Sequence, residues 1–301
     1  MSKPYIIFTD DGSDMPFSVL SEYECGIATM YCTFDKTSYN YVYNDIDNYL
    51  EFYDKIRNGF TPHTEPLSKD DCINLLSPYM EKGLDILFVS FSSLLSASYF
   101  SLCEAKEVLK AKYPAQSLIV VDSKRAASSL ALMVEQALIM QQAGKSLGEV
   151  YQWLESYKLS YHSVFMIDDI FYIVNESQRG TVAEKNSGSS LSGALAHFAM
   201  LANVKPILHN DSLGKIDVLE TASGRKKAID KLCKILEEKV YTPENNVIYI
   251  SHGDCREDAE KLKEKIESKL NFKEIRINMS GPMIGAHMGA DTLSISYMGK
   301  G

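Results

Sequence analysis

The stretch Asp85-Ile-Leu-Phe-Val-Ser-Phe-Ser-Ser-Leu-Leu-Ser-Ala-Ser-Tyr99 decides how the rest of the sequence is interpreted. It opens with an apolar run at residues 86–91, which has the length of a buried strand. A helical pattern follows at residues 100–112. Around the junction lie five serines: Ser90, Ser92, Ser93, Ser96 and Ser98. These serines are therefore expected at the carboxyl end of a strand, where open α/β sheets bind their ligands.

Two interpretations of these serines stay open. Hydroxyl groups, together with the free N–H groups at the start of a helix, can hold an anion. Serines are also common as N-caps and in turns, where they serve only the backbone. One or two serines in this position are typical of capping, whereas five beside one strand end make a ligand cradle equally reasonable.

Strands and helices alternate on both sides of this stretch, which predicts an α/β fold with a mainly parallel sheet. We expect further strands at residues 5–9, 27–34 and 117–121. Helices are expected at residues 15–25, 47–57, 124–144 and 147–157, with another that begins after Ser68. Ser13 or Asp14 is expected to cap the first helix.

The pattern changes near residues 156–161, so we expect two α/β domains, residues 1–158 and 159–301. In the second domain, strands are expected at residues 163–167, 204–208, 215–221, 247–251, 273–277 and 292–297. Helices are expected at residues 168–176, 191–202, 224–239 and 256–270. The polar residues 177–190 predict an exposed loop.

The composition narrows the class of protein. The chain has 301 residues, 45% of them hydrophobic and 24% charged, and a net charge of −9, which argues against nucleic acid or an anionic membrane as a partner. The sequence contains no apolar run of transmembrane length and no apolar core of a signal peptide near its start. Its six cysteines are scattered, so we expect reduced thiols and a cytoplasmic protein.

Two other segments carry candidate ligand groups. Thr61, His63 and Thr64 are expected in a loop between prolines, where they form either a second wall of donors or a plain surface turn. The glycine-dense loop at residues 281–289 contains His287, which can donate to a carboxylate or serve a structural role.

Catalytic and metal motifs have little support. The sequence has no GxSxG elbow, no phosphate-binding P-loop, no GxGxxG and no HExxH. A Ser/His/Asp triad is defined by geometry and stays open. Asp10, Asp11 and Asp14 are chemically suited to Mg²⁺, but turn and cap roles explain at least Asp14, so we expect no metal. Arg179 and Arg225 are either anion clamps or solvated charges.

Six motifs in order along the chain make it resemble the DegV family of fatty-acid-binding proteins. They are Phe8-Thr-Asp-Asp-Gly-Ser-Asp-Met-Pro16, Ser92-Ser-Leu-Leu-Ser-Ala-Ser-Tyr99, Val121-Asp-Ser-Lys124, Val204-Lys-Pro-Ile207, Arg225-Lys-Lys-Ala228 and Gly281-Pro-Met-Ile-Gly-Ala-His287. The resemblance covers nearly the full length and implies two α/β domains with a fatty acid between them. The acyl chain would lie in an apolar tunnel, with the carboxylate near the domain interface.

The resemblance also implies roles for particular residues. Ser92 or Ser93 and His287 match the positions that contact the carboxylate in the family. His63-Thr64 falls where the family usually has Thr-Ser, which makes Thr61 and Thr64 the candidate hydroxyls there. Ser96, Arg179 and Gly285 are expected as neighbours of the head group. Such proteins need no cofactor or metal and present the carboxylate to a separate fatty acid kinase.

This sequence departs from the family pattern at several positions. The family's SGT reads Ser96-Ala97-Ser98, and its HTGPG reads His287-Met-Gly-Ala-Asp291. The usual GGR segment is not intact, Arg179 is displaced, and Ser223 stands where an arginine usually precedes RKKA. Because fewer arginines face the head group, the resemblance supports fatty acid binding more strongly than kinase docking.

The sequence therefore predicts a non-catalytic carrier of a long-chain fatty acid. Burial of about fourteen methylenes gains roughly 11 kcal/mol before the costs of association. A carboxylate carried in with the chain needs donors, because its burial without them is costly. The alternative is a hydrolase or transferase that acts on a small carboxylate or phosphate. Such an enzyme needs a base beside an exposed serine, whereas a carrier needs a long apolar channel.

Overall fold

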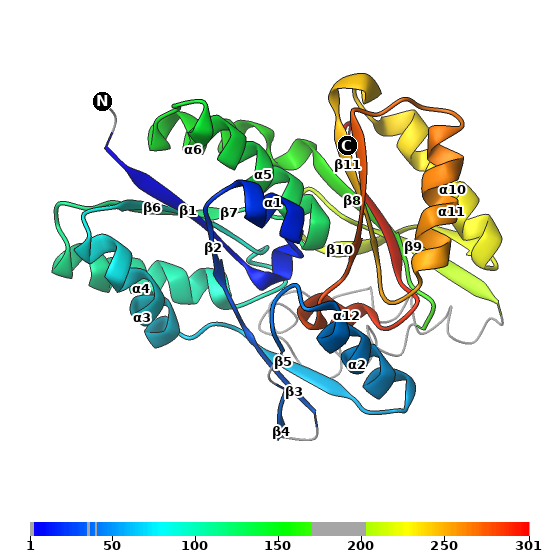
Figure 1. Cartoon of the computed structure of the whole chain (residues 1–301), viewed down its shortest axis with the longest axis horizontal. Helices are drawn as coiled ribbons and strands as arrows, with labels where there is room; N and C mark the ends of the chain where they lie inside the picture. Colours follow the sequence, from blue (N-terminus) through cyan, green and yellow to red (C-terminus); the bar gives the residue numbers. More distant parts are fainter. Residues whose placement is uncertain (1–2, 35–36, 40, 170–202, 301) are drawn as a thin grey trace.

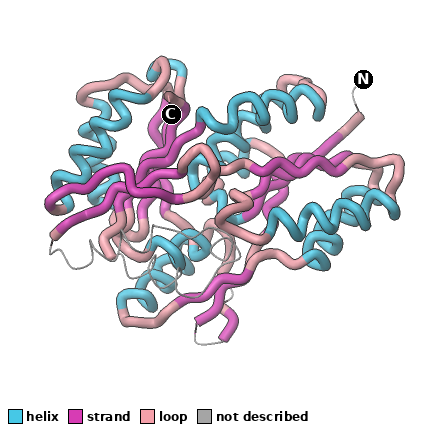
Figure 2. The backbone as a smooth tube through the Cα atoms, turned by 180° about the vertical axis from the view of Figure 1, so that it is seen from behind, coloured by secondary structure: helices cyan, strands magenta, loops and turns pink. Residues whose placement is uncertain are grey.

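The computed structural model describes residues 3–34, 37–39, 41–169 and 203–300. Two large β-sheets carry helices on their outer faces, and a small third sheet lies below the junction between them (Figure 1). Figure 2 shows the same arrangement from behind, with strands in magenta flanked by cyan helices. Among the described residues, no helix combines the length and apolar character needed to cross a membrane.

The first sheet is entirely parallel, as the alternation of strands and helices predicted. Its strand order is β2-β1-β6-β7, made of Cys25–Ala28, Tyr5–Asp10, Asp85–Ser90 and Leu118–Asp122. Side chains alternate along β1 and β6. Ile6 and Phe88 pack against helices α3 (Lys69–Glu81) and α4 (Ser98–Lys112). Ile7 and Leu87 face the opposite layer of helices α1, α5 and α6 (Phe17–Glu22, Ala127–Gln142 and Leu147–Tyr157).

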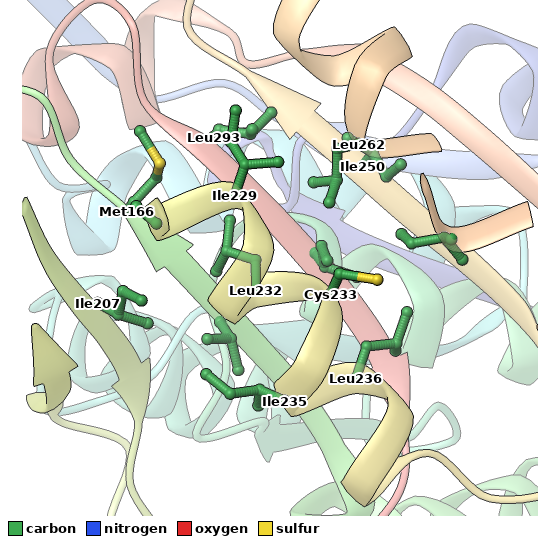
Figure 3. Packing of buried hydrophobic residues seen from close by; sticks show 14 of the residues in the cluster. Met166, Ile207, Ile229, Leu232, Cys233, Ile235, Leu236, Ile250, Leu262 and Leu293 are labelled. Atoms are coloured by element: carbon green, nitrogen blue, oxygen red, sulfur yellow. The ribbon is translucent and has the colours of Figure 1, made fainter. Parts of the chain in front are cut away.

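The second sheet is mixed and has six strands in the order β10-β9-β8-β13-β11-β12. They are Ile216–Ser223, Val204–Asn210, Tyr161–Met166, Leu293–Met298, Val247–His252 and Glu274–Met279. Only β11 and β12 pair in parallel. Helices α10 (Arg225–Lys239) and α11 (Arg256–Glu267) cover its outer face, where Leu232 and Leu236 meet Ile250 and Leu293 (Figure 3).

Helix α5 packs against the inner faces of both large sheets. It packs on β1 of the first sheet and on β8, β11 and β13 of the second. Ten of its residues are buried, which explains why its sequence is apolar on nearly every side. The strands of the first sheet and of the small third sheet all lie before residue 123, and the strands of the second sheet all lie after residue 160. We propose the domain boundary at residues 158–159.

The third sheet differs from the sequence prediction. The single strand expected at residues 27–34 is two strands, β2 in the first sheet and β3 (Tyr31–Phe34) in the small sheet β4-β3-β5. Strand β4 is Thr37–Ser38. The loop expected at residues 61–66 is largely strand β5 (Pro62–Glu65). A proline is tolerated here because it is the first residue of an edge strand.

Several helix ends also differ from the predictions. Helix α1 has Pro16 at its N-cap and no capping side chain, so the predicted cap by Ser13 or Asp14 was wrong. The segment expected as a glycine-rich loop contains a short helix, α12 (Pro282–Met288), which packs with α2 (Ile46–Arg57) beside the small sheet. The helix predicted to begin after Ser68 is confirmed as α3, and Ser68 and Asp71 form a capping box at its start. The loop predicted at residues 177–190 and the helix at 191–202 lie outside the described residues, as does all but the start of the helix predicted at 168–176.

Candidate functional site

Three segments that carry predicted site residues meet at the carboxyl end of the parallel sheet. They are the turn after β6 (residues 91–97, the serine turn), strand β5 and helix α12. Helix α12 packs against β5, β3, α2 and the short 3-10 helix η1 (Asp11–Ser13). The backbone N–H of Leu67, just after β5, donates over 3.1 Å to Ser98 Oγ, in the first residue of α4 directly after the serine turn. The three segments are therefore physically connected.

Ser92 holds the serine turn to the second sheet. Its side chain is fully buried. The hydroxyl donates to the carbonyl of Gly214, in the turn between β9 and β10, over 2.8 Å. Its backbone N–H donates to the carbonyl of Arg125 over 3.0 Å. Because a hydroxyl has one proton, the hydroxyl of Ser92 is committed to a contact between the two large sheets.

Ser93 and Ser96 are half-buried and take part in the local structure of the turn. The Ser93 hydroxyl donates to Asp122 Oδ2 over 2.7 Å, and its backbone N–H donates to Asp122 Oδ1 over 3.1 Å. The Ser96 hydroxyl donates to Ser98 Oγ over 3.0 Å. Turn stabilisation therefore accounts for much of the serine cluster, and the Ser93 hydroxyl is restrained at the sheet end by Asp122.

Thr64 and His287 are brought together from positions 223 residues apart in the sequence. Thr64 Oγ1 lies 2.9 Å from His287 Nε2, and both residues are half-buried. If Nε2 carries the proton it donates to Thr64, whose own hydroxyl proton then points to another acceptor. If Nδ1 carries the proton, Thr64 donates to the ring. The pair thus combines a hydroxyl and an imidazole in one partly open position.

The register of the small sheet separates His63 from Thr64. Thr64 pairs with Cys32, which is buried, whereas His63 pairs with Thr33. Successive strand residues point to opposite faces, so His63 lies on the face away from α12. Thr61 directly precedes β5 and is half-buried.

Gly285 is accounted for by packing within the protein. A Cβ atom at this position would lie 2.7 Å from Cε1 of Phe52 and 2.8 Å from the hydroxyl oxygen of Tyr53. Both rings belong to α2 and are fully buried. The glycine therefore allows α12 to pack closely on α2. Arg179 lies outside the described residues.

Two buried features of this region were missed by the sequence interpretation. Arg125 is only 1% exposed and donates to the carbonyl oxygens of Lys124, Asp211 and Leu159. Burial lowers the pKa of Arg125 to about 10. An arginine after a strand-end turn is ordinarily a solvated charge, and the sequence contains no signal that this one is buried.

The second missed feature is the acidic segment Asp10–Asp14. Its three aspartates are nearly fully buried. Burial raises the pKa of Asp10 and of Asp11 to about 7 each, and the pKa of Asp14 to about 8. Within the described residues, no group of His, Cys, Asp and Glu side chains has an arrangement suited to a metal ion. The carboxyl groups of the three aspartates accept hydrogen bonds from backbone N–H and hydroxyl groups.

Arg225, the other predicted anion clamp, is held by acids of its own protein. Its guanidinium donates to Asp258 over 2.5 Å, to Asp168 over 3.2 Å and to the backbone carbonyl of Asp291 over 2.7 Å. These contacts fix the start of α10 to the first turn of α11, to the segment after β8 and to the loop before β13. Arg225 therefore already has carboxylate partners within the chain.

Comparisons with known proteins agree with this fold. A family model described as "Uncharacterised protein, DegV family" matches residues 5–300. DegV domain-containing protein CPE0026 of Clostridium perfringens (strain 13 / Type A) is 32% identical over 300 residues, which cover 99% of this chain and 98% of the relative.

Solved structures are also similar to this chain. A DegV lipid binding protein from Thermotoga maritima superposes with a TM-score of 0.82 at 21% identity, covering 98% of each chain. A DegV family protein from Thermus thermophilus, described for its fatty acid binding, has a TM-score of 0.82 at 22% identity, covering 99% of this chain and all of that one. At such identity, the likeness establishes the fold.

Proposed function

This chain belongs to the DegV family, and on that premise we propose that it binds a long-chain fatty acid. The observation that carries the proposal is the contact between Thr64 and His287, which places two side chains suited to a carboxylate at the junction of β5 and α12. The fatty acid and lipid binding described for the structural relatives supports the same ligand class.

The chemistry of the pair fits a carboxylate. A carboxylate that leaves water with an apolar chain must be hydrogen-bonded, or its burial is costly. Thr64 supplies a hydroxyl and His287 a ring nitrogen, and a protonated imidazole also adds charge to the hydrogen bond. We place Thr64 and His287 at the carboxylate, with Thr61 as a neighbouring hydroxyl and with Ser93 as a further donor once its hydroxyl turns away from Asp122. In this proposal Ser92 holds the turn in place.

The proposal has a second part, in which the chain does no chemistry itself and presents the carboxylate to a separate fatty acid kinase. Its support is the family resemblance together with the half-buried positions of Thr64 and His287, which put the head group near the surface. The rival hydrolase interpretation has less support. A nucleophilic serine needs a general base, and the hydroxyl of Ser92 donates to a backbone carbonyl, which cannot serve as one. The hydroxyl of Ser93 donates to Asp122, and the same carboxylate accepts the backbone N–H groups of Ser93 and Lys124, as expected of an aspartate that stabilises a turn.

Titration with a fluorescent long-chain fatty acid tests the site. We expect Thr64→Val and His287→Ala each to weaken binding by about 1–3 kcal/mol, because each leaves a buried carboxylate short of a partner. His63→Ala is the matched control, since His63 is the neighbour of Thr64 in β5 and lies on the opposite face of the strand. Equal affinity of all three variants and the wild type would remove Thr64 and His287 from the proposed site.

A further inference from the structure

Three segments, here called walls, surround the proposed carboxylate site: the serine turn, the β3–β5 pair and helix α12. A hydrogen-bonded backbone N–H group lies at the start of each wall. The serine turn begins at Phe91, directly after β6. Strand β3, which pairs with Thr64 of β5, begins after Met30. Helix α12, which carries His287, begins after its N-cap residue Gly281. The partners of these three N–H groups therefore fix where the site residues stand.

All three N–H groups donate to carboxyl groups of the acidic segment. Phe91 N donates to Asp10 Oδ2 over 2.8 Å. Met30 N donates to Asp11 Oδ2 over 3.1 Å. Gly281 N donates to Asp14 Oδ1 over 2.9 Å. One five-residue segment thus makes one hydrogen bond to the start of each wall.

Other contacts strengthen two of these connections. The hydroxyl of Tyr41, in the connection before α2, also donates to Asp11 Oδ2. The side-chain amide of Asn278, at the end of β12, donates to the carbonyl oxygen of Asp14 over 3.0 Å. Asp14 therefore joins the first sheet to the part of the second sheet from which α12 emerges.

Burial of these three carboxyl groups is unfavourable for folding, which indicates that they serve a specific purpose. In the described part of the chain, one oxygen of each of the three carboxyl groups has no hydrogen-bond partner. Within the described residues, these carboxyl groups accept hydrogen bonds from backbone N–H and hydroxyl groups and from no lysine or arginine. Buried acids without a cationic partner oppose folding unless they hold a proton. A turn or a cap alone needs only one such residue.

We propose that Asp10, Asp11 and Asp14 are positioning residues that set the relative placement of the serine turn, the β3–β5 pair and α12 for a carboxylate ligand. The inference rests on the proposed function, since it concerns the same site. The aspartates act through the walls and do not contact the ligand themselves. Loss of one carboxyl group should therefore displace one wall and lower affinity, while the donors on that wall stay chemically intact.

Asp14 offers the sharpest test, because it holds the helix that carries His287. We expect Asp14→Ala to raise the Kd for a fluorescent long-chain fatty acid about tenfold, the usual effect of one lost hydrogen bond to a buried carboxyl group. Asp14→Asn keeps an oxygen acceptor for Gly281 N and should restore most of the affinity. Equal Kd values for wild type and Asp14→Ala would overturn the inference.

Asp85 provides a matched control. It is buried, it accepts one backbone N–H, from Ser117 over 2.7 Å, and it begins β6 at the opposite end of the same sheet. Unlike the three aspartates, it also pairs with a lysine, Lys3, over 2.5 Å. Asp85→Ala should lower stability and leave the Kd within about twofold of wild type, since both lost contacts are remote from the site. A Kd increase in Asp85→Ala as large as in Asp14→Ala would overturn the inference, because affinity would then follow general stability.

Hydrogen exchange on the wild-type protein covers the case in which Asp14→Ala does not fold. Saturating fatty acid should slow exchange at the amides of Phe91, Met30 and Gly281, because a bound carboxylate joins the three walls. Unchanged exchange at all three amides, with binding verified in the same sample, would contradict the inference. A wild-type protein that binds no fatty acid would instead refute the proposed function.

Discussion

Single residues in this protein have roles that their sequence neighbours do not share. His63 and Thr64 are adjacent, yet they point to opposite faces of β5, and Thr64 is the one whose hydroxyl lies 2.9 Å from His287 Nε2. Ser92 and Ser93 are also adjacent, but one donates to the second sheet and the other to Asp122. The serine motif therefore marks a turn at which separate parts of the chain meet, and its role in ligand binding stays a prediction. The motif did not show which of its hydroxyl groups donate hydrogen bonds within the protein itself.

The acidic segment leads to a prediction about pH. Burial raises the pKa of Asp14 to about 8 and the pKa of Asp10 and Asp11 to about 7 each. An unfolded aspartate titrates near pH 4, so between these values the folded protein binds more protons than the unfolded chain. The contribution of the three aspartates to the free energy of unfolding is therefore complete below about pH 4, and it is lost as the pH rises through about 7 to 8.

We expect the free energy of unfolding to fall less steeply in Asp14→Asn than in wild type between about pH 7 and pH 8, as measured by urea unfolding. Burial lowers the pKa of His162 and of His252 to about 4, so these rings are neutral in the folded state throughout this range. Parallel pH profiles for the two proteins would show that Asp14 is already ionised in the folded wild type.

At the scale of elements, α12 explains why the glycine-dense segment was misinterpreted. Glycines at close spacing ordinarily predict a loop. Here Gly281 is the N-cap, and Gly285 lies where the helix crosses two aromatic rings of α2. The partner that makes a helix favourable at this position lies more than 200 residues away in the sequence. Local pattern alone contains no information about that contact.

Gly285→Ala should therefore destabilise the protein although alanine favours helices. The added Cβ would approach Phe52 and Tyr53 closer than van der Waals contact allows, and overpacking typically costs about 1–3 kcal/mol. Gly148→Ala in α6 is the matched control, because no atom lies within 4 Å of its Cβ position. The free energy of unfolding of Gly148→Ala should rise by up to about 1 kcal/mol. Thermal unfolding of both variants checks the pair, and a stabilised Gly285→Ala would contradict the packing described.

The small sheet was also only partly predictable. Residues 27–34 contain a nearly continuous apolar pattern, so a single strand was the natural interpretation. The chain leaves the first sheet after Ala28 and enters the small sheet at Tyr31, and the intervening Met30 N is held by Asp11. The break between β2 and β3 is therefore set by the contact of Met30 N with Asp11, which follows β1. Local strand propensity contains no information about this contact. Strands buried on both faces, such as β6, were found readily because their sequence is apolar throughout.

For the whole molecule, the sequence predicted the alternation of elements and hence the parallel first sheet. It did not predict how the two large sheets share α5. That packing includes a buried network in which Tyr249 donates to Glu135 over 2.6 Å and Arg276 donates to the same carboxylate over 2.6 Å. Glu135 belongs to α5, whereas Tyr249 and Arg276 belong to β11 and β12.

Arg276→Met should destabilise the protein by about 3–5 kcal/mol, because it leaves the Glu135 carboxylate buried without its cation. Addition of Glu135→Gln should recover part of the loss, since the amide oxygen still accepts from Tyr249 and carries no charge. Arg256→Met breaks a pair with Glu260 whose side chains are 67% and 44% exposed, and should cost less than about 1 kcal/mol. Denaturant unfolding measures all three. Equal losses for Arg276→Met and Arg256→Met would show that the interface does not depend on this network.

Native mass spectrometry of the purified recombinant protein, with solvent extraction of any bound molecule, tests whether this protein binds a long-chain fatty acid. We expect a co-purifying long-chain fatty acid at about one per chain, since such a ligand gains roughly 0.8 kcal/mol for each buried methylene. The extract would also reveal the preferred chain length. An apo mass that stays unchanged after palmitate and oleate are added would contradict the claim and redirect the search to a smaller anion.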